Sequence, residues 1–210
     1  MSQPPAPTAA ANRHSDGDTG ENENENLTFT IAPATESDLP DVTALFALYA
    51  QSLNIDLTFQ SFAEELAGLP GKYAPPTGQI LLARRVNPPH PPHPHSDSHD
   101  DTNGITARGE AIGCVAVRPI TLQTGNDKEI KRCEMKRLYA LPSTRGQGVG
   151  RALVASVVEA AAGLGYREMY LDTLASMDAA RGLYSRFGFE GTEAYYHNPH
   201  DGVVFLVKRL

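Results

Sequence analysis

The stretch that decides the fold is Leu138-Tyr-Ala-Leu-Pro-Ser-Thr-Arg-Gly-Gln-Gly-Val-Gly-Arg-Ala-Leu153. A strand pattern runs into a glycine-rich turn, and the turn opens a helix that the apolar periodicity predicts over residues 148–164. A helix N-terminus carries unpaired backbone N–H groups and a partial positive charge, so it attracts anions. Three glycines remove the Cβ atoms that would keep an anion away from these groups, namely Gly146, Gly148 and Gly150.

Positive side chains flank this turn, since Arg145 precedes the glycines and Arg151 follows them. The construction suits a pyrophosphate or a similar phosphate group. A Walker-type loop is excluded, because it ends in Gly-Lys-Ser or Gly-Lys-Thr and the turn does not. A dinucleotide-binding fingerprint would run G-x-G-x-x-G, and Asp172 does follow at about the spacing of its acidic residue. Against that alternative, the glycines here run G-x-G-x-G, and residues 141–145 make the turn too long.

Periodicity along the rest of the chain predicts the element order β-α-α-β-β-β-α-β-α-β-β, an α/β domain with a mixed sheet. Thr35 to Asp38 is typical of a helix start, Ser176 is expected to cap the last helix, and Gly165 is expected to end the central one. The strands are predicted at 27–31, 79–83, 111–117, 129–140, 168–172, 189–195 and 203–208, and the other helices from Leu39, over 57–69 and over 176–187.

Charge is distributed unevenly along the 210 residues. Residues 1–26 contain five acidic residues and one basic residue, and residues 87–110 contain four and one. These two stretches carry the whole formal net charge of −7, so the rest of the chain is neutral. No basic face is therefore expected, which argues against a nucleic-acid-binding protein.

The same two stretches have compositions typical of disorder. We predict a disordered tail over 1–26, a domain over 27–210, and a disordered insertion at about 87–110 within the hairpin of strands 79–83 and 111–117. The insertion is rich in proline, aspartate and histidine. No metal site is predicted there, because chelation by a flexible loop must overcome its ordering entropy. Its histidines are His90, His93, His95 and His99.

The two cysteines, Cys114 and Cys133, fall in predicted strands and have no metal-ligand spacing, so buried free thiols in a reducing compartment are expected. No apolar run reaches the roughly 18 residues of a membrane helix, and residues 1–26 lack the apolar core of a secretory signal. The expectation is a cytoplasmic protein with no membrane partner.

Three motifs in order resemble the GNAT superfamily of acyl-CoA-dependent N-acetyltransferases. Arg145-Gly-Gln-Gly-Val-Gly150 matches its Q/R-x-x-G-x-G/A signature, and Glu134-Met-Lys-Arg-Leu-Tyr-Ala140 resembles the strand before it. Ala180-Arg-Gly-Leu-Tyr-Ser-Arg-Phe-Gly-Phe189 resembles the family's A-x-x-x-Y-x-x-x-G-F helix end. The resemblance spans about 27–210. It implies a single domain with a mixed, mostly antiparallel sheet flanked by about four helices.

The resemblance also implies acetyl-CoA as co-substrate. Its pyrophosphate would bind backbone N–H groups of residues 147–151, and its pantetheine arm would lie along Leu138 and Ala140. The thioester would lie where this strand and the strand at 168–172 separate. The cofactor residues implied are Leu138, Tyr139, Ala140, Arg145, Gly146, Gln147, Gly148, Val149, Gly150 and Arg151.

Two catalytic residues follow from the same resemblance. Tyr184 matches the tyrosine that protonates the leaving thiolate, and Glu134 falls where the family often has its general base. Strand alternation would put Glu134 and Leu138 on one face. Each residue also has a structural alternative: Tyr184 as a core aromatic whose hydroxyl bonds backbone, and Glu134 as a strand carboxylate paired with Lys136 or Arg132.

The sequence gives the least information about the acceptor site. By analogy with the family, an amine would bind between the first two helices and the final hairpin, near Asp56, Phe59, Tyr195, Tyr196 and His197. We expect a primary amine of a small metabolite or amino acid. The alternatives are acetylation of a protein N-terminus or lysine, and a non-catalytic acyl-CoA-binding regulator. The family is often dimeric, so a homodimer would be in keeping with it.

Overall fold

The computed structural model describes residues 27–86, 108–122 and 130–210. The predicted tail, the histidines of the predicted insertion and the side chain of Phe59 lie outside the described part. Residues 108–110 are described and lie against the preceding strand. The N–H of Arg85 donates to the carbonyl of Glu110 at 2.9 Å, and the guanidinium of Arg84 donates to the carbonyl of Gly109 at 2.9 Å.

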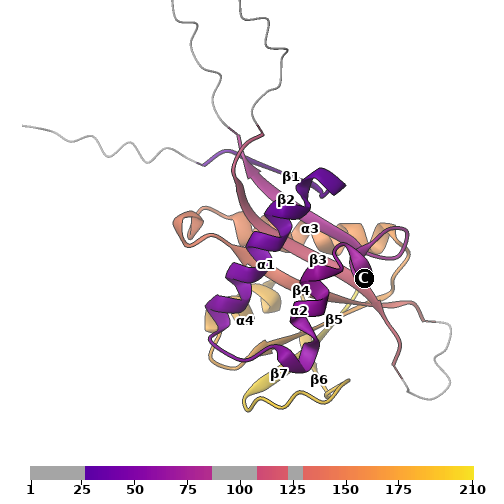
Figure 1. The fold of residues 1–210 in the computed structure, drawn as a ribbon. Coiled ribbons are helices and arrows are strands. Elements are labelled where there is room, and N and C mark those ends of the chain that lie inside the picture. Colours follow the sequence, from indigo (N-terminus) through magenta and orange to yellow (C-terminus); the bar gives the residue numbers. More distant parts are fainter. Residues whose placement is uncertain (1–26, 87–107, 123–129) are drawn as a thin grey trace, which may run out of the picture.

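Seven strands of the described chain form one sheet in the order β1-β2-β3-β4-β5-β7-β6 (Figure 1). Only β4 and β5 pair in parallel, and all other neighbours are antiparallel. This confirms the predicted mixed, mostly antiparallel sheet and the β2–β3 hairpin. The strands are β1 (Phe29–Pro33), β2 (Gln79–Arg85), β3 (Ala111–Ile120), β4 (Arg132–Ala140), β5 (Glu168–Leu174), β6 (Glu190–Thr192) and β7 (Val203–Arg209).

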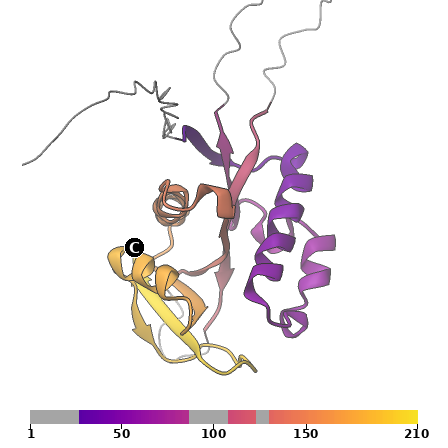
Figure 2. The same cartoon turned by 90° about the vertical axis from the view of Figure 1, so that its left-hand side faces the viewer.

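Helices cover both faces of this sheet. Figure 2 shows α1 (Leu39–Leu53) and α2 (Phe62–Ala67) on one side, and α3 (Val149–Gly163) and α4 (Asp178–Arg186) on the other. The four predicted helices and their order are confirmed. None of the described helices is long and apolar enough to cross a bilayer.

Three predicted element boundaries were wrong. The helix expected over 57–69 is a short 3-10 turn, η2 (Thr58–Gln60), followed by α2, because Ser61 adopts a left-handed conformation with φ 53°. Strand β5 stays paired with β7 as far as Leu174, so α4 begins only at Asp178 and Ser176 does not cap it. Strand β6 ends at Thr192, which leaves Tyr195 in the loop before β7.

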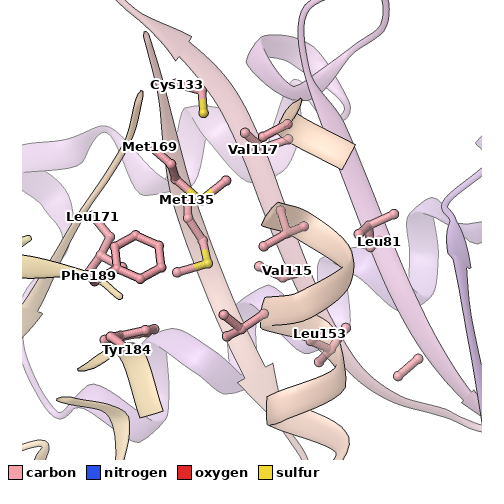
Figure 3. Packing of buried hydrophobic residues seen from close by; sticks show 14 of the residues in the cluster. Leu81, Val115, Val117, Cys133, Met135, Leu153, Met169, Leu171, Tyr184 and Phe189 are labelled. Carbon is pink, nitrogen blue, oxygen red and sulfur yellow. The ribbon is translucent and has the colours of Figure 1, made fainter. Parts of the chain in front are cut away.

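Two apolar clusters lie on the two faces of the sheet. The larger joins β3, β4 and β5 to α3 and α4, and Figure 3 shows Val115, Met135 and Leu153 among its members. The smaller packs β2 and β3 against α1. Cys133 belongs to the first and Cys114 to the second, and both are free and buried as predicted. Burial raises the pKa of Cys133 to about 12, so its thiol stays protonated.

A β-bulge interrupts β4 at Arg137, whose φ is 58°. The register runs from Cys114↔Tyr139 to Ala116↔Lys136, so two residues of β4 oppose one of β3. The extra residue reverses the alternation beyond it. Leu138 packs into the larger apolar cluster, whereas Glu134 faces the opposite side of the sheet. The prediction that Glu134 and Leu138 share a face was therefore wrong.

The two parallel strands pair over a short distance only. Their register covers Arg132–Glu134 against Glu168–Tyr170. Beyond this point β4 continues to Ala140 and β5 to Leu174 without pairing to each other. The strands therefore separate at the level of Glu134, and the family resemblance implies that the thioester lies in this gap.

Candidate active site

The turn before α3 exposes a row of backbone donors. Gly146 and Gly148 have φ values of 77° and 82°, which favour glycine, and a Cβ at either position would meet no atom within 4 Å. Gln147 is a correction to the expected donors, because its N–H donates to the carbonyl of Thr144 at 3.2 Å. The N–H groups without an acceptor in the described chain are those of Gly146, Gly148, Val149, Gly150 and Arg151.

Positive side chains lie beside these donors. Arg145 and Arg151 are exposed, and neither forms an ion pair with a described residue. Together with the helix N-terminus they make a site for a phosphate anion in an open position. No group of three potential metal ligands occurs within the described residues.

The first cavity lies in the gap between β4 and β5. It is narrow, about 90 Å³, and α1, the loop after it and α4 complete its walls. The predicted residues Leu138 and Tyr184 both line it. Three charged side chains that the sequence did not single out as site residues line it as well: Lys136, Arg137 and Asp172.

Tyr184 enters this cavity from α4. Its side chain is buried, and its ring meets the ring of Phe189 edge-on at 5.8 Å (Figure 3). Its hydroxyl has no hydrogen-bond partner among the described residues, whereas the hydroxyl of Tyr166 donates to the carbonyl of Thr77. The backbone bond expected of a purely structural tyrosine is therefore missing. Burial raises the pKa of Tyr184, so the phenol remains protonated.

Glu134 lies on the other face of β4 and is 1% exposed. Its Oε2 accepts from Nε of Arg118 at 2.8 Å and lies 2.6 Å from Nη2 of the same guanidinium. Its Oε1 accepts from the hydroxyl of Tyr195 at 2.8 Å. The expected alternative partners are secondary, because Lys136 lies 3.5 Å away and Arg132 pairs with Glu168.

A second cavity of about 440 Å³ opens on this face. Glu134 lines it together with the predicted residues Tyr195, Tyr196 and His197. Asp56, which was also predicted as a substrate residue, lies outside this lining. Its carboxylate accepts from the N–H and the hydroxyl of Thr58, both at 2.8 Å, and lines neither cavity.

Gln60 and Lys136 line both cavities, so they mark the boundary between them. Nζ of Lys136 lies 2.8 Å from Oδ1 of Asp172. Burial acts to lower the pKa of Lys136, but the carboxylates of Glu134 and Asp172 outweigh it and raise that pKa, so the ammonium stays charged. A lysine in the middle of a predicted buried strand was the sequence signal for this pair.

Arg137 at the bulge forms the second buried pair that sequence reasoning missed. Its Nε lies 2.7 Å from Oε1 of Glu65, and its Nη2 lies 3.1 Å from Oε2. Its guanidinium packs over the rings of Tyr49 and Phe62, at 5.6 Å and 4.9 Å. The pair ties α2 to β4 directly beside the first cavity.

The described residues thus bring together two parallel strands that separate, a helix opened by glycines, and a buried tyrosine in the gap between the strands. A profile of the acetyltransferase (GNAT) family matches residues 73–189. An uncharacterized N-acetyltransferase of Schizosaccharomyces pombe is 41% identical over 80% of this chain and 86% of its own length. The chain belongs to the GNAT family and is an N-acetyltransferase.

Solved structures agree with this fold. A putative acyl-CoA N-acyltransferase from Klebsiella pneumoniae superposes with a TM-score of 0.55 at 25% identity, covering 87% of this chain and 97% of that one. Arabidopsis thaliana NAA60, solved in complex with acetyl-CoA, gives a TM-score of 0.58 at 17% identity over 87% and 99%. The predicted GNAT-like architecture is confirmed.

Proposed function

We propose that this enzyme transfers the acetyl group of acetyl-CoA to the primary amine of a small metabolite or amino acid. The observation that carries the proposal is the pair of cavities that share Gln60 and Lys136, with the unpartnered hydroxyl of Tyr184 in the first. Acetyl-CoA would occupy the first cavity and the amine the second. Their reacting atoms would meet at the shared boundary.

The donor would bind in two parts. The free N–H groups at the start of α3 would hold its pyrophosphate, with Arg145 and Arg151 beside it. The edge of β4 that faces β5 has no strand partner beyond Glu134. The pantetheine arm can therefore add to this edge as an extra strand would, along Leu138, Tyr139 and Ala140.

The reaction we propose is direct attack. The amine nitrogen bonds to the thioester carbonyl carbon, and the backbone N–H of Leu138 donates to the oxygen that becomes negative. When the C–S bond breaks, the thiolate takes the proton of Tyr184. Glu134 receives the proton lost by the amine, directly or through water, which balances the exchange.

A small acceptor is favoured by contacts that join two loops beside the second cavity. The hydroxyl of Tyr196 accepts from Gln60 at 3.5 Å and from Asn198 at 3.0 Å. The ring of His200 bonds to the carbonyl of Asp56 at 2.8 Å. These contacts join the loop before β7 to the loop after α1, whereas a protein substrate needs an open groove.

The test is an acetyl-transfer screen that detects free CoA thiol. The panel contains primary amines, amino acids and peptides with free N-termini or lysines. Saturable turnover with small amines supports the proposal. Turnover confined to peptides would favour a protein acetyltransferase. Tight acetyl-CoA binding without turnover on any amine would favour a non-catalytic acyl-CoA-binding regulator.

A further inference from the structure

The charges of the described residues around the second cavity are not balanced. Three buried or half-buried carboxylates each have a cation: Glu65 has Arg137, Glu134 has Arg118, and Asp172 has Lys136. One more cation lines this cavity, the exposed Lys72, and it forms no ion pair with any residue that the structure describes. Counted over the described residues, the cavity therefore has one positive charge in excess.

Arg118 also has unused hydrogen-bonding capacity. Its Nε donates to Oε2 of Glu134, its Nη2 lies 2.6 Å from the same oxygen, and Nη1 has no partner within the described residues. The side chain lines the second cavity and is 22% exposed, so a ligand can reach it. A guanidinium with a free donor is well suited to a carboxylate oxygen.

The boundary between the cavities has an unused acceptor. Oε1 of Gln60 is buried and has no hydrogen-bond partner in the described chain, while Nε2 of the same amide donates to Tyr196. A buried polar atom without a partner is costly. A ligand N–H at this point would supply the missing donor.

We propose that the acceptor is an amine that also carries a carboxylate. The carboxylate would bind Nη1 of Arg118 and the ammonium of Lys72, and the amine N–H would donate to Oε1 of Gln60 beside the thioester. This inference rests on the proposed function and narrows its substrate class. It also disfavours acceptors with a second cationic group, since Lys72 and Arg118 would repel it.

The test compares matched acceptors with the full-length enzyme at saturating acetyl-CoA. Each set contains an amino acid, its carboxamide and its decarboxylated amine, for phenylalanine and for γ-aminobutyrate. At least one acid should show a kcat/KM roughly tenfold or more above its two neutral-tail analogues, an effect of about 1.4 kcal/mol. Added salt should raise the KM of that acid selectively.

Two lysine variants complete the test. Lys72→Met should raise the KM of the acid by about fivefold, the size expected of a partly exposed ion pair, and leave the KM of its carboxamide unchanged. Lys131→Met is the control, because Lys131 is an exposed lysine that lines neither cavity.

Carboxamides and amines that match the acids in kcat/KM would overturn this inference and leave the proposed function standing. An equal effect of Lys72→Met on acid and carboxamide would also overturn it. Absence of acetyl transfer to every amine would remove the proposed function and this inference together.

Discussion

Nζ of Lys136 and Oδ1 of Asp172 lie 2.8 Å apart across the gap where β4 and β5 separate. Both side chains are largely buried, and the same ammonium lies 3.5 Å from Glu134. One lysine thus compensates a carboxylate from each strand. The ion pair joins the two strands where their backbone pairing has ended.

Lys136→Met should lower the free energy of unfolding by about 3 kcal/mol, because it leaves Asp172 buried without its cation. The double variant Lys136→Met with Asp172→Leu should recover part of that loss, since it removes both charges. Urea unfolding of the parent, Lys136→Met, Asp172→Leu and the double variant measures the coupling between the two residues. Strictly additive losses would contradict a direct interaction.

Tyr184→Phe should lower kcat at least about a hundredfold, the usual contribution of a general acid, with little change in acetyl-CoA affinity. Steady-state kinetics and calorimetric titration with acetyl-CoA measure the two effects. Tyr170→Phe is the control, because that hydroxyl donates to Glu168 and its side chain lines neither cavity. Unchanged turnover in Tyr184→Phe would remove this residue from the acid role.

Glu134→Gln should shift the pH–rate profile toward higher pH, where the free amine is already neutral and needs no base. The amide has nearly the same shape, so the fold should be retained. The kcat should fall most at low pH, where the amine still needs a base. Glu168→Gln is a matched control, as it also loses a cation-paired strand carboxylate but one outside both cavities. An unaltered profile would mean that another group takes the proton.

Gly148→Val should weaken acetyl-CoA binding roughly tenfold and destabilise the fold by about 1–2 kcal/mol, because φ at this position is 82°. The new side chain would meet no protein atom within 4 Å at its Cβ, so the loss of affinity would come from the ligand side. Gly163→Ala, at the far end of the same helix, should bind acetyl-CoA normally and be as stable or more so. Binding is measured by titration and stability by thermal unfolding.

Protonation of Asp38 should make the fold less stable in acid. Burial acts to raise its pKa, but hydrogen bonds from Thr35 and Arg84 and the charge of Arg108 lower it to about 2. Because the folded pKa is below the unfolded one, this carboxylate stabilises the fold by about 2 kcal/mol above roughly pH 4. The contribution is lost as the pH falls through about 2.

The variant Asp38→Asn isolates this effect. It should be less stable than the parent at pH 6 and approach it at low pH, as judged by urea unfolding across about pH 2–6. Asp178→Asn is the control, since the Asp178 side chain is 90% exposed. A constant difference at every pH would contradict the assigned titration.

The elements that the sequence predicts well are those whose signals are local. The glycines at 146 and 148 adopt positive φ, as a turn that opens onto an anion requires, and the apolar stripe of α3 faces the sheet. Tyr184 could be placed on the last helix from its motif, and it lies on α4 and lines the first cavity. The order of strands and helices followed from similar local patterns.

The parts that could not be predicted depend on contacts distant in sequence. Glu134 finds its cation in Arg118 because the two residues lie opposite each other in the β3–β4 register. The carboxylate of Asp56 accepts from the N–H of Thr58, two residues away, and Asp56 lines neither of the two cavities. The bulge at Arg137 could not be predicted from the sequence, because no glycine marks this position. Arg137 forms a buried ion pair there with Glu65 of α2.

That bulge sets how β4 can tolerate changes in length. Deleting Arg137 would restore regular two-residue periodicity and would leave Glu134 and Leu138 on the opposite faces that they already occupy, at the cost of the buried ion pair with Glu65. A single-residue insertion or deletion elsewhere in the strand would exchange its two faces. Relatives should therefore differ in the length of β4 only at the bulge, whereas residues 87–107 should vary freely in number. A deep comparison of homologous chain lengths would reveal this contrast directly.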